Sequence, residues 1–275
     1  MTVGAPPIRP RSEWAAQSPP RGSLATEAPG DVQFLLVHHT ATANDYGPEA
    51  VPGLIQSFYR LHTGSARGWP DVAYNFFVDR HGSIWEGRAG RIDAPVRGDA
   101  TGGSQGLAQL CAFIGDHGVE APAPAAQGAM VSLLAWLGTR HDIDTSVRAT
   151  TSFTSRGLNR WPAGARVIAP TIAAHRAMSQ TELPGEAAFR LVRDALPAQV
   201  NNRRVETTLA ATATSTTLTT QQSPSAGAPV RPAPRPVVND RPSGAPLPLL
   251  GTEALAALAA VSGVVALRRR GGTGS

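Results

Sequence analysis

Two histidines stand where a protein commonly places reactive side chains. His38 follows an apolar run that ends at Val37, and His175 opens the segment HRAMSQTELPG, which a Pro-Gly pair closes. Imidazole is the commonest metal ligand in proteins and also a general acid or base near neutral pH. Taken alone, either histidine is more often a hydrogen-bonded residue at the end of a strand, so its meaning depends on the residues around it.

The first half of the chain alternates between strand and helix patterns. Val32 and the run from Phe34 to Val37 predict a strand buried on both faces, which ends at His38-His39-Thr40. Apolar residues at helical spacing predict a helix from Val51 to Leu61, closed by Gly64. Residues 72–78 and 83–86 predict the two strands of a hairpin.

The second half continues the same alternation. Residues 107–114 predict a third buried strand, and apolar spacing predicts helices around residues 130–137 and 189–196. Helices between strands are typical of an α/β domain with a mixed central β-sheet flanked by helices. The single cysteine, Cys111, falls inside the third strand and is interpreted as a small buried hydrophobe. One cysteine excludes an intramolecular disulfide and a cysteine-rich zinc module.

Composition argues against nucleic acid as a partner. All 25 basic residues are arginine, the formal net charge is +5, and the arginines are scattered along the chain. A nucleic-acid-binding domain gathers its basic residues on one face or one helix. The N-terminal residues MTVGAPPIRPRSEW lack an apolar stretch, so no export signal is visible there.

Composition also divides the chain into four regions. Residues 1–198 have the mixture expected of one folded domain, and residues 199–244 are rich in Thr, Ala and Pro, which predicts a disordered linker. Residues 245–270 are predicted to form an apolar helix that ends in three arginines and is interpreted as a C-terminal membrane anchor, and 271–275 are a short tail. This anchor is only marginally long enough to span a bilayer, and Glu253 falls inside it.

Four blocks in order give the two histidines their context: IRPRSEWAA (8–16), FLLVHHTAT (34–42), GWPDVAYNFFVDRHGSIWEGR (68–88) and AHRAMSQTELPGEAAF (174–189). With these blocks the chain resembles the family of peptidoglycan recognition proteins and type 2 zinc amidases. The resemblance implies a mixed sheet flanked by helices. It also implies cleavage of the amide between N-acetylmuramic acid and L-alanine, or recognition of peptidoglycan without cleavage.

The resemblance assigns a metal site that is one ligand short. His38 and His175 match the two histidine ligands of zinc, whereas Leu183 occupies the position of the third, which is a cysteine or aspartate in the family. Tyr74 matches the tyrosine beside the metal-bound water, and Thr181 matches the residue that stabilises the oxyanion. Three protein ligands and one open position are usual for catalytic zinc. Replacement of the missing ligand by a nearby donor stays open, with these candidates: Glu182, Glu186 and Cys111.

The family's substrate groove is better represented. Arg88 matches an arginine that pairs with the extra carboxylate of diaminopimelate in the peptide stem, and a guanidinium suits that contact. Trp69 is a second groove candidate, and His39 is assigned to the same surface. For Arg88 and Trp69, an ordinary surface position is an equal alternative. A tryptophan that many relatives carry shortly after the arginine is absent, with Gly90 near its place.

Two functions follow as alternatives. The chain is expected to be a peptidoglycan-binding module with an incomplete zinc site, or a zinc-dependent N-acetylmuramoyl-L-alanine amidase with an unusual third ligand. Both alternatives imply a monomer at the outer face of the cell envelope, with peptidoglycan or muropeptides as partners and the membrane reached through the C-terminal segment. Zinc is the only cofactor implied.

Overall fold

A six-stranded mixed sheet forms the centre of the domain in the computed structural model, which describes residues 3–28, 30–100, 106–158 and 160–220, with side chains as far as residue 210. The strand order is β1-β4-β3-β5-β2-β8. Every neighbouring pair is parallel except β3 and β4, which form the predicted hairpin. The strands span β1 (Ile8–Arg9), β2 (Phe34–His39), β3 (Phe76–Val78), β4 (Ile84–Glu86), β5 (Ala108–Phe113) and β8 (Ile172–Ala174).

The two longest strands of the sheet, β2 and β5, are mostly apolar because both of their faces are covered. Every residue of β2 and β5 is buried, and Leu36 lies opposite Leu110 in their parallel register. Burial of both faces explains the continuous apolar runs in the sequence. Cys111 lies within β5 and is fully buried, as the sequence predicted.

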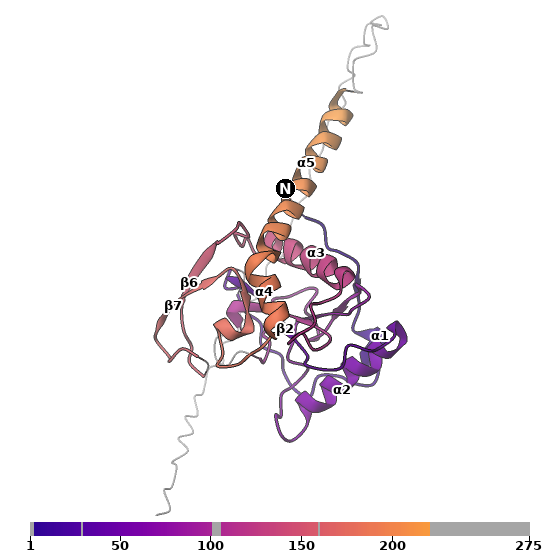
Figure 1. The fold of residues 1–275 in the computed structure, drawn as a ribbon, viewed down its shortest axis with the longest axis vertical. Helices are drawn as coiled ribbons and strands as arrows, with labels where there is room; N and C mark the ends of the chain where they lie inside the picture. Colours follow the sequence, from indigo (N-terminus) through magenta and orange to yellow (C-terminus); the bar gives the residue numbers. More distant parts are fainter. Residues whose placement is uncertain (1–2, 29, 101–105, 159, 221–275) are drawn as a thin grey trace, which may run out of the picture. The chain divides into compact units, whose positions relative to one another are not determined.

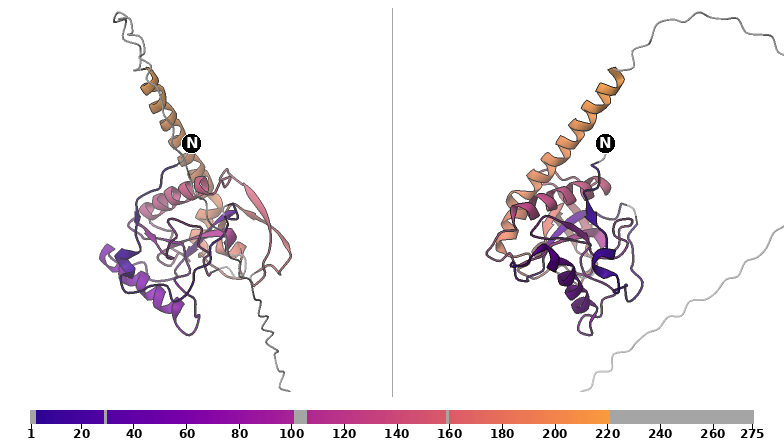
Figure 2. Two further views of the ribbon diagram at one scale, coloured as in Figure 1. Left: turned by 180° about the vertical axis from the view of Figure 1, so that it is seen from behind. Right: turned by 90° about the vertical axis from the view of Figure 1, so that its right-hand side faces the viewer.

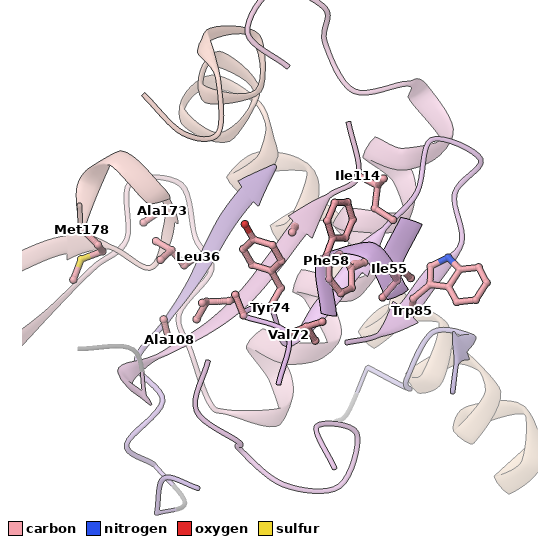
Figure 3. Packing of buried hydrophobic residues seen from close by; sticks show 14 of the residues in the cluster. Leu36, Ile55, Phe58, Val72, Tyr74, Trp85, Ala108, Ile114, Ala173 and Met178 are labelled. Carbon is pink, nitrogen blue, oxygen red and sulfur yellow. The ribbon is translucent and has the colours of Figure 1, made fainter. Parts of the chain in front are cut away.

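Helices cover the two faces of the sheet as separate layers (Figure 1). On one face lie α1 (Ser12–Ala15), η1 (Pro48–Ala50) and α2 (Val51–Thr63); on the other lie α3 (Pro124–Arg140), α4 (Glu186–Asp194) and α5 (Leu196–Thr220). The α2 helix buries one side that includes Ile55 and Phe58. Figure 3 shows part of this core, with the ring of Tyr74 between Leu36 and Phe58. The α/β fold with a mixed central sheet flanked by helices is therefore confirmed.

A second, two-stranded sheet does not follow from the sequence patterns described above. β6 (Thr150–Thr154) and β7 (Arg166–Pro170) pair as an antiparallel hairpin at the rim of the domain, away from α2 (Figure 1 and Figure 2). One face of the hairpin packs on the core, where Phe153 stacks on Phe34 with ring centroids 5.3 Å apart. Only a few apolar residues alternate with Thr, Ser and Arg here, so the pattern is weak in the sequence.

Three boundaries differ from the sequence-based predictions. The ladder of β3 begins at Phe76, so residues 72–75 form the turn before it and not part of the strand. The helix expected around 189–196 is divided into α4 and α5 at Ala195. Leu61, expected on the buried side of α2, is 56% exposed.

The α5 helix also crosses the boundary predicted at residue 198 (Figure 2). Val200 is fully buried against α3, and the guanidinium of Arg204 donates to the carbonyl of Ile143 (2.9 Å) and to the hydroxyl of Thr145 (2.7 Å). The folded domain therefore extends past residue 198 because two side chains of the predicted linker dock on it.

The predicted membrane anchor, 245–270, and the tail, 271–275, lie outside the described residues. By its contacts the chain divides into two units, Met1–Ser223 and Pro224–Ser275, and the described residues belong to the first. Within them, no helix combines the length and the apolar character that a membrane span requires.

Candidate functional site

The parallel pairing of β2 with β8 brings the two predicted metal ligands together. Val37 lies opposite Ala174 in the register, so the next residues, His38 and His175, emerge side by side at the carboxyl ends of the two strands. Their ring centroids are 4.0 Å apart, with 35° between the ring planes. Both side chains are buried. Residues from distant parts of the sequence thus form one imidazole pair, and their role as metal ligands stays a prediction.

Tyr74 completes the centre of the site. Its ring centroid lies 5.1 Å from that of His38. The neighbouring Asn75 fixes this segment, because its backbone N–H donates to the carbonyl of Leu110 and its side-chain oxygen accepts from the N–H of Leu110. Burial raises the pKa of Tyr74 to about 12, so its phenol remains protonated and able to donate a hydrogen bond at neutral pH.

The imidazole pair is buried in its neutral form. Within the described part of the chain, the four ring nitrogens of His38 and His175 are buried without a hydrogen bond of normal geometry. Burial lowers the pKa of His38 well below its usual value, and the nearby His175 adds to this shift. Burial also lowers the pKa of His175 to about 4, although the backbone of Ala100 acts in the opposite direction. Two neutral imidazoles with free nitrogens suit a shared electrophile such as zinc.

The loop that carries Leu183 is held by its backbone and by Arg176. The N–H of Arg176 donates to the carbonyl of Leu183 (3.0 Å), and its guanidinium contacts the carboxylate of Glu186 (3.0 Å) and the carbonyl of Glu182 (2.5 Å). At the end of the loop, Gly185 has a φ of 82°, and a Cβ there would lie 2.4 Å from the carbonyl carbon of His117. The loop is therefore fixed by contacts that do not involve the Leu183 side chain.

A third protein ligand does not complete the pair. Among the residues that the structure describes, no group of three His, Cys, Asp or Glu side chains could hold a metal ion. Of the three replacement candidates, Glu182 has a 98% exposed side chain, Glu186 forms ion pairs with Arg176 and Arg190, and Cys111 is buried inside β5. Burial also raises the pKa of the Cys111 thiol to about 12, which disfavours the thiolate that zinc requires.

Thr181, the expected oxyanion residue, lies in the same loop as Leu183. Its hydroxyl accepts a hydrogen bond from the N–H of Leu183 (3.3 Å). Within the described residues, no hydrogen bond joins it to His38, Tyr74 or His175. The structure therefore shows Thr181 supporting the loop, and its assignment to catalysis remains a prediction.

His62 belongs to the site although the sequence analysis did not select it. Its ring lies between Tyr74 (5.8 Å between centroids) and Trp69 (5.1 Å). The Nδ1 atom accepts from the N–H of Ala73 (3.1 Å), so the neutral ring carries its proton on Nε2. Its signal in the sequence is its helical spacing after Ile55 and Phe58, which places an imidazole on the buried side of α2.

Trp69 extends the site away from the imidazole pair. Its indole is partly buried, and the guanidinium of Arg67 lies 4.8 Å from the ring centroid. We call the resulting series of aromatic and imidazole rings the ring row; it consists of His175, His38, Tyr74, His62 and Trp69. The row contains no charged side chain; four of its rings are buried, and Trp69 at its end is only partly buried.

The structure does not bring two predicted substrate residues to this row. The Arg88 side chain is 3% exposed, pairs with Asp99 (2.5 Å) and donates to the carbonyl of Val72 (3.0 Å). The side chain of His39 points to the opposite face of the sheet from that of His38. There its Nδ1 accepts from the N–H of His117 (2.9 Å). Both side chains have internal partners because a buried charge or imidazole without one is costly. Their substrate contacts remain predictions.

We expect acid to destabilise the domain through its buried histidines. Burial lowers the pKa of six histidines, to about 4 for His62 and three others. Well above pH 6.5 these histidines are neutral in both the folded and the unfolded chain. As the pH falls toward 4, the unfolded chain binds protons that the folded chain excludes, so stability falls. Each such histidine contributes a loss of about 1–1.5 kcal/mol at pH 5.5.

The measurement is the free energy of unfolding in urea between pH 7 and pH 5. His62→Gln should reduce the loss of stability on acidification, since it removes one of the titrating groups. His81→Gln changes an exposed histidine and is the matched control. Equal pH dependence in wild type and His62→Gln would contradict the prediction.

The comparisons with known proteins agree with the fold. Residues 28–186 match the family model described as N-acetylmuramoyl-L-alanine amidase, and the chain belongs to this family. Peptidoglycan-recognition protein LE of Drosophila melanogaster is 41% identical over 81 residues, which cover 30% of this chain and 23% of that protein. Peptidoglycan recognition protein 1 of Rattus norvegicus is 32% identical over 128 residues, which cover 46% of this chain and 66% of that protein. The chain thus spans less than two thirds of the length of both relatives.

Solved structures show the same architecture. The crystal structure of peptidoglycan recognition protein-LE in complex with tracheal cytotoxin, a monomeric diaminopimelic acid-type peptidoglycan, has a TM-score of 0.51 and 27% identity. The match covers 68% of this chain and 92% of the chain in the solved structure. Drosophila peptidoglycan recognition protein SA has a TM-score of 0.53 at 20% identity, covers 69% of this chain and 92% of its own, and supports the fold alone. The family expected from the four sequence blocks is confirmed.

Proposed function

We propose that this protein binds peptidoglycan through the ring row and hydrolyses it little or not at all. Its family contains both recognition proteins and amidases. A relative at 27% identity was crystallised with a monomeric peptidoglycan fragment, which supports a muropeptide as the ligand. The ring row supplies aromatic and imidazole rings that end at the partly buried Trp69, and the Tyr74 hydroxyl and the Nε2–H of His62 supply hydrogen-bond donors.

One observation carries the second half of this proposal. His38 and His175 offer two nitrogens for zinc, and Leu183 stands in the loop that supplies the third ligand in the family. Zinc, when bound in such enzymes, activates a water and polarises the scissile carbonyl. A complete structural site binds zinc by about 10–16 kcal/mol, so the loss of one ligand costs roughly 3–5 kcal/mol, or two to four decades of affinity. The described residues therefore do not fit the family's three-ligand zinc site.

Two measurements on the full chain test the proposal. Elemental analysis of protein purified without added metal should give far less than one zinc per chain. Retention on purified peptidoglycan and binding of a soluble monomeric muropeptide should both be observed. Absence of retention and of muropeptide binding would exclude recognition, whereas one tightly bound zinc would favour an enzyme.

Trp69→Ala should weaken muropeptide binding by roughly tenfold, because an indole at a binding surface commonly contributes more than 1 kcal/mol. Trp69 is only partly buried and stands at the end of the ring row, so the domain should remain folded. Isothermal titration with a monomeric muropeptide measures the change. Leu209→Ala, at an exposed residue of α5, is the control, and equal affinity of all three proteins would remove Trp69 from the binding surface.

A second candidate function is an active amidase with an unusual third ligand. The observation in its favour is that, among the described residues, four buried imidazole nitrogens have no hydrogen bond of normal geometry, since each unsatisfied buried polar group costs about 1–3 kcal/mol. A bound metal would remove this cost. Release of stem peptides from purified peptidoglycan tests this function, and His175→Ala must abolish the release. If the His175→Ala protein released stem peptides as the wild type does, the activity would come from a contaminating enzyme.

We also propose that the protein acts in the cell envelope and that residues 245–270 hold it at the membrane. The support is the apolar run from Ala254 to Leu267, followed by Arg268, Arg269 and Arg270. Membrane fractionation of the full chain and of a chain that ends at Ser243 tests this proposal. Equal partition of the two chains into the soluble fraction would exclude the anchor.

A further inference from the structure

The hairpin of β6 and β7 lies in a segment from which acidic residues are missing. Arginines are scattered over the whole chain, but no Asp or Glu occurs between Asp144 and Glu182. The same segment contains five arginines: Arg148, Arg156, Arg160, Arg166 and Arg176. The basic residues of this segment therefore have no acidic neighbours in the sequence, and such a separation of charge indicates an anionic partner.

One side of this hairpin is open to solvent. Alternate residues of β6 and β7 are exposed, while Phe153, Val167 and Ala169 between them pack on the core. In the antiparallel register, Ser152 lies opposite Ile168. We call the exposed side, together with the residue two positions before β6, the hairpin face; it consists of Arg148, Thr150, Ser152, Thr154, Arg166 and Ile168.

The arginines of this segment have different roles. Arg156 pairs with the buried Glu27 (2.7 Å), and Arg160 donates to the carbonyl of Arg176 (3.1 Å), so both hold the structure together. Arg166 instead donates to the hydroxyl of Ser152 (3.2 Å) on the hairpin face. Arg148 and Arg166 are exposed, and no ion pair with a described carboxylate engages either of them. These two guanidinium groups can bind an external anion without breaking an internal pair.

The hairpin is attached directly to the candidate site. The loop between its strands is hydrogen-bonded to the turn that follows His175, through the Arg160 N–H to the carbonyl of Met178 (2.9 Å) and the Trp161 indole N–H to the carbonyl of Ala177 (3.1 Å). The hairpin therefore continues the surface of the protein beyond the imidazole pair. A polymer bound at the ring row and longer than the row would extend along the hairpin.

We propose that the hairpin face binds the carboxylates of a second peptide stem in polymeric peptidoglycan, next to the stem held at the ring row. This inference rests on the proposed function and adds a second contact to it. Guanidinium and hydroxyl donors match carboxylate oxygens, and polymeric peptidoglycan repeats its stems. Two contacts on one polymer increase avidity. A single muropeptide has only one stem and cannot reach both contacts.

The test compares polymer and monomer. The full chain and the double variant R148Q/R166Q are titrated against a soluble monomeric muropeptide and against peptidoglycan stripped of covalently attached phosphate polymers. Affinity for the polymer should fall about three- to tenfold in the variant, as expected for two exposed charge contacts, while affinity for the monomer stays unchanged. The loss should disappear at high salt, where exposed charges are screened.

The control R190Q/R203Q removes the same charge from exposed positions of α4 and α5 and should behave as wild type. Equal loss in this control would show a nonspecific charge effect and overturn the inference. Unchanged polymer binding in R148Q/R166Q, or a loss seen only on walls that keep their phosphate polymers, would overturn it too. If the wild type fails to bind the monomer but R148Q/R166Q weakens polymer binding, the contact proposed at the ring row fails and the hairpin contact stands.

Discussion

Leu183→Cys should raise zinc affinity by about two to four decades and bring amidase activity above background. The substitution adds the one ligand that separates this site from a three-ligand zinc site, worth roughly 3–5 kcal/mol. His38 and His175 are already paired, and the loop is held by the backbone contacts of Arg176 and Thr181, which the change leaves in place. Competition with a chromogenic chelator measures the affinity, and release of stem peptides measures the activity.

Leu183→Ala is the matched control for this experiment. It removes the same isopropyl group but adds no donor atom, so it should not gain zinc. Combining Leu183→Cys with His175→Ala should return the affinity to background, since one imidazole is then lost. A Leu183→Cys protein that folds normally and gains nothing would mean that the loop has departed from the family's geometry as well as from its ligand.

Asp71→Ala should destabilise the domain by about 3–5 kcal/mol, the usual cost of breaking a buried ion pair by removing one partner. The Asp71 carboxylate is fully buried. It accepts hydrogen bonds from the guanidinium of Arg11 (2.8 Å) and from the backbone N–H groups of Val72 (2.8 Å) and Ala89 (3.0 Å). The two N–H groups would lose this acceptor, and Arg11 would lose its ion pair and keep only its bonds to the carbonyls of Ser18 and Gly87. The site would suffer as well, because Asp71 anchors the segment between Trp69 and Tyr74.

Thermal unfolding should show a midpoint lowered by roughly 10 °C for this variant. Asp45→Ala, at an exposed aspartate, is the control and should unfold close to wild type. Asp71→Asn is the informative intermediate, because the amide oxygen keeps some of the accepted hydrogen bonds without the charge. A midpoint for Asp71→Ala within 2 °C of wild type would show that the carboxylate network contributes little.

Much of the fold and the centre of the site could be predicted from the sequence. The strands β2 and β5 are continuous apolar runs, and burial on both faces leaves no other pattern. His38 and His175 were found through the family blocks, and the pairing of β2 with β8 explains why they meet. The central sheet was predictable because burial dictates residue type along its strands.

Other features depend on side-chain direction and long-range docking, which spacing does not encode. Arg88 was placed correctly at the end of a hairpin, but its side chain turns inward to Asp99. The hairpin of β6 and β7 has little apolar alternation, and α5 continues past residue 198 because Val200 and Arg204 find partners on α3 and the following loop. His62 could have been found by asking why an imidazole occupies the buried side of a helix.

The position of β8 has a consequence for the order in which this protein is completed. β8 is the last strand of the main sheet in the chain, and it lies at the edge of that sheet, beside β2. During synthesis, an emerging chain can pair β2 with β5 while the other side of β2 is still bare. Only when residues 172–175 leave the ribosome does His38 gain its partner, so the imidazole pair is among the last features to form.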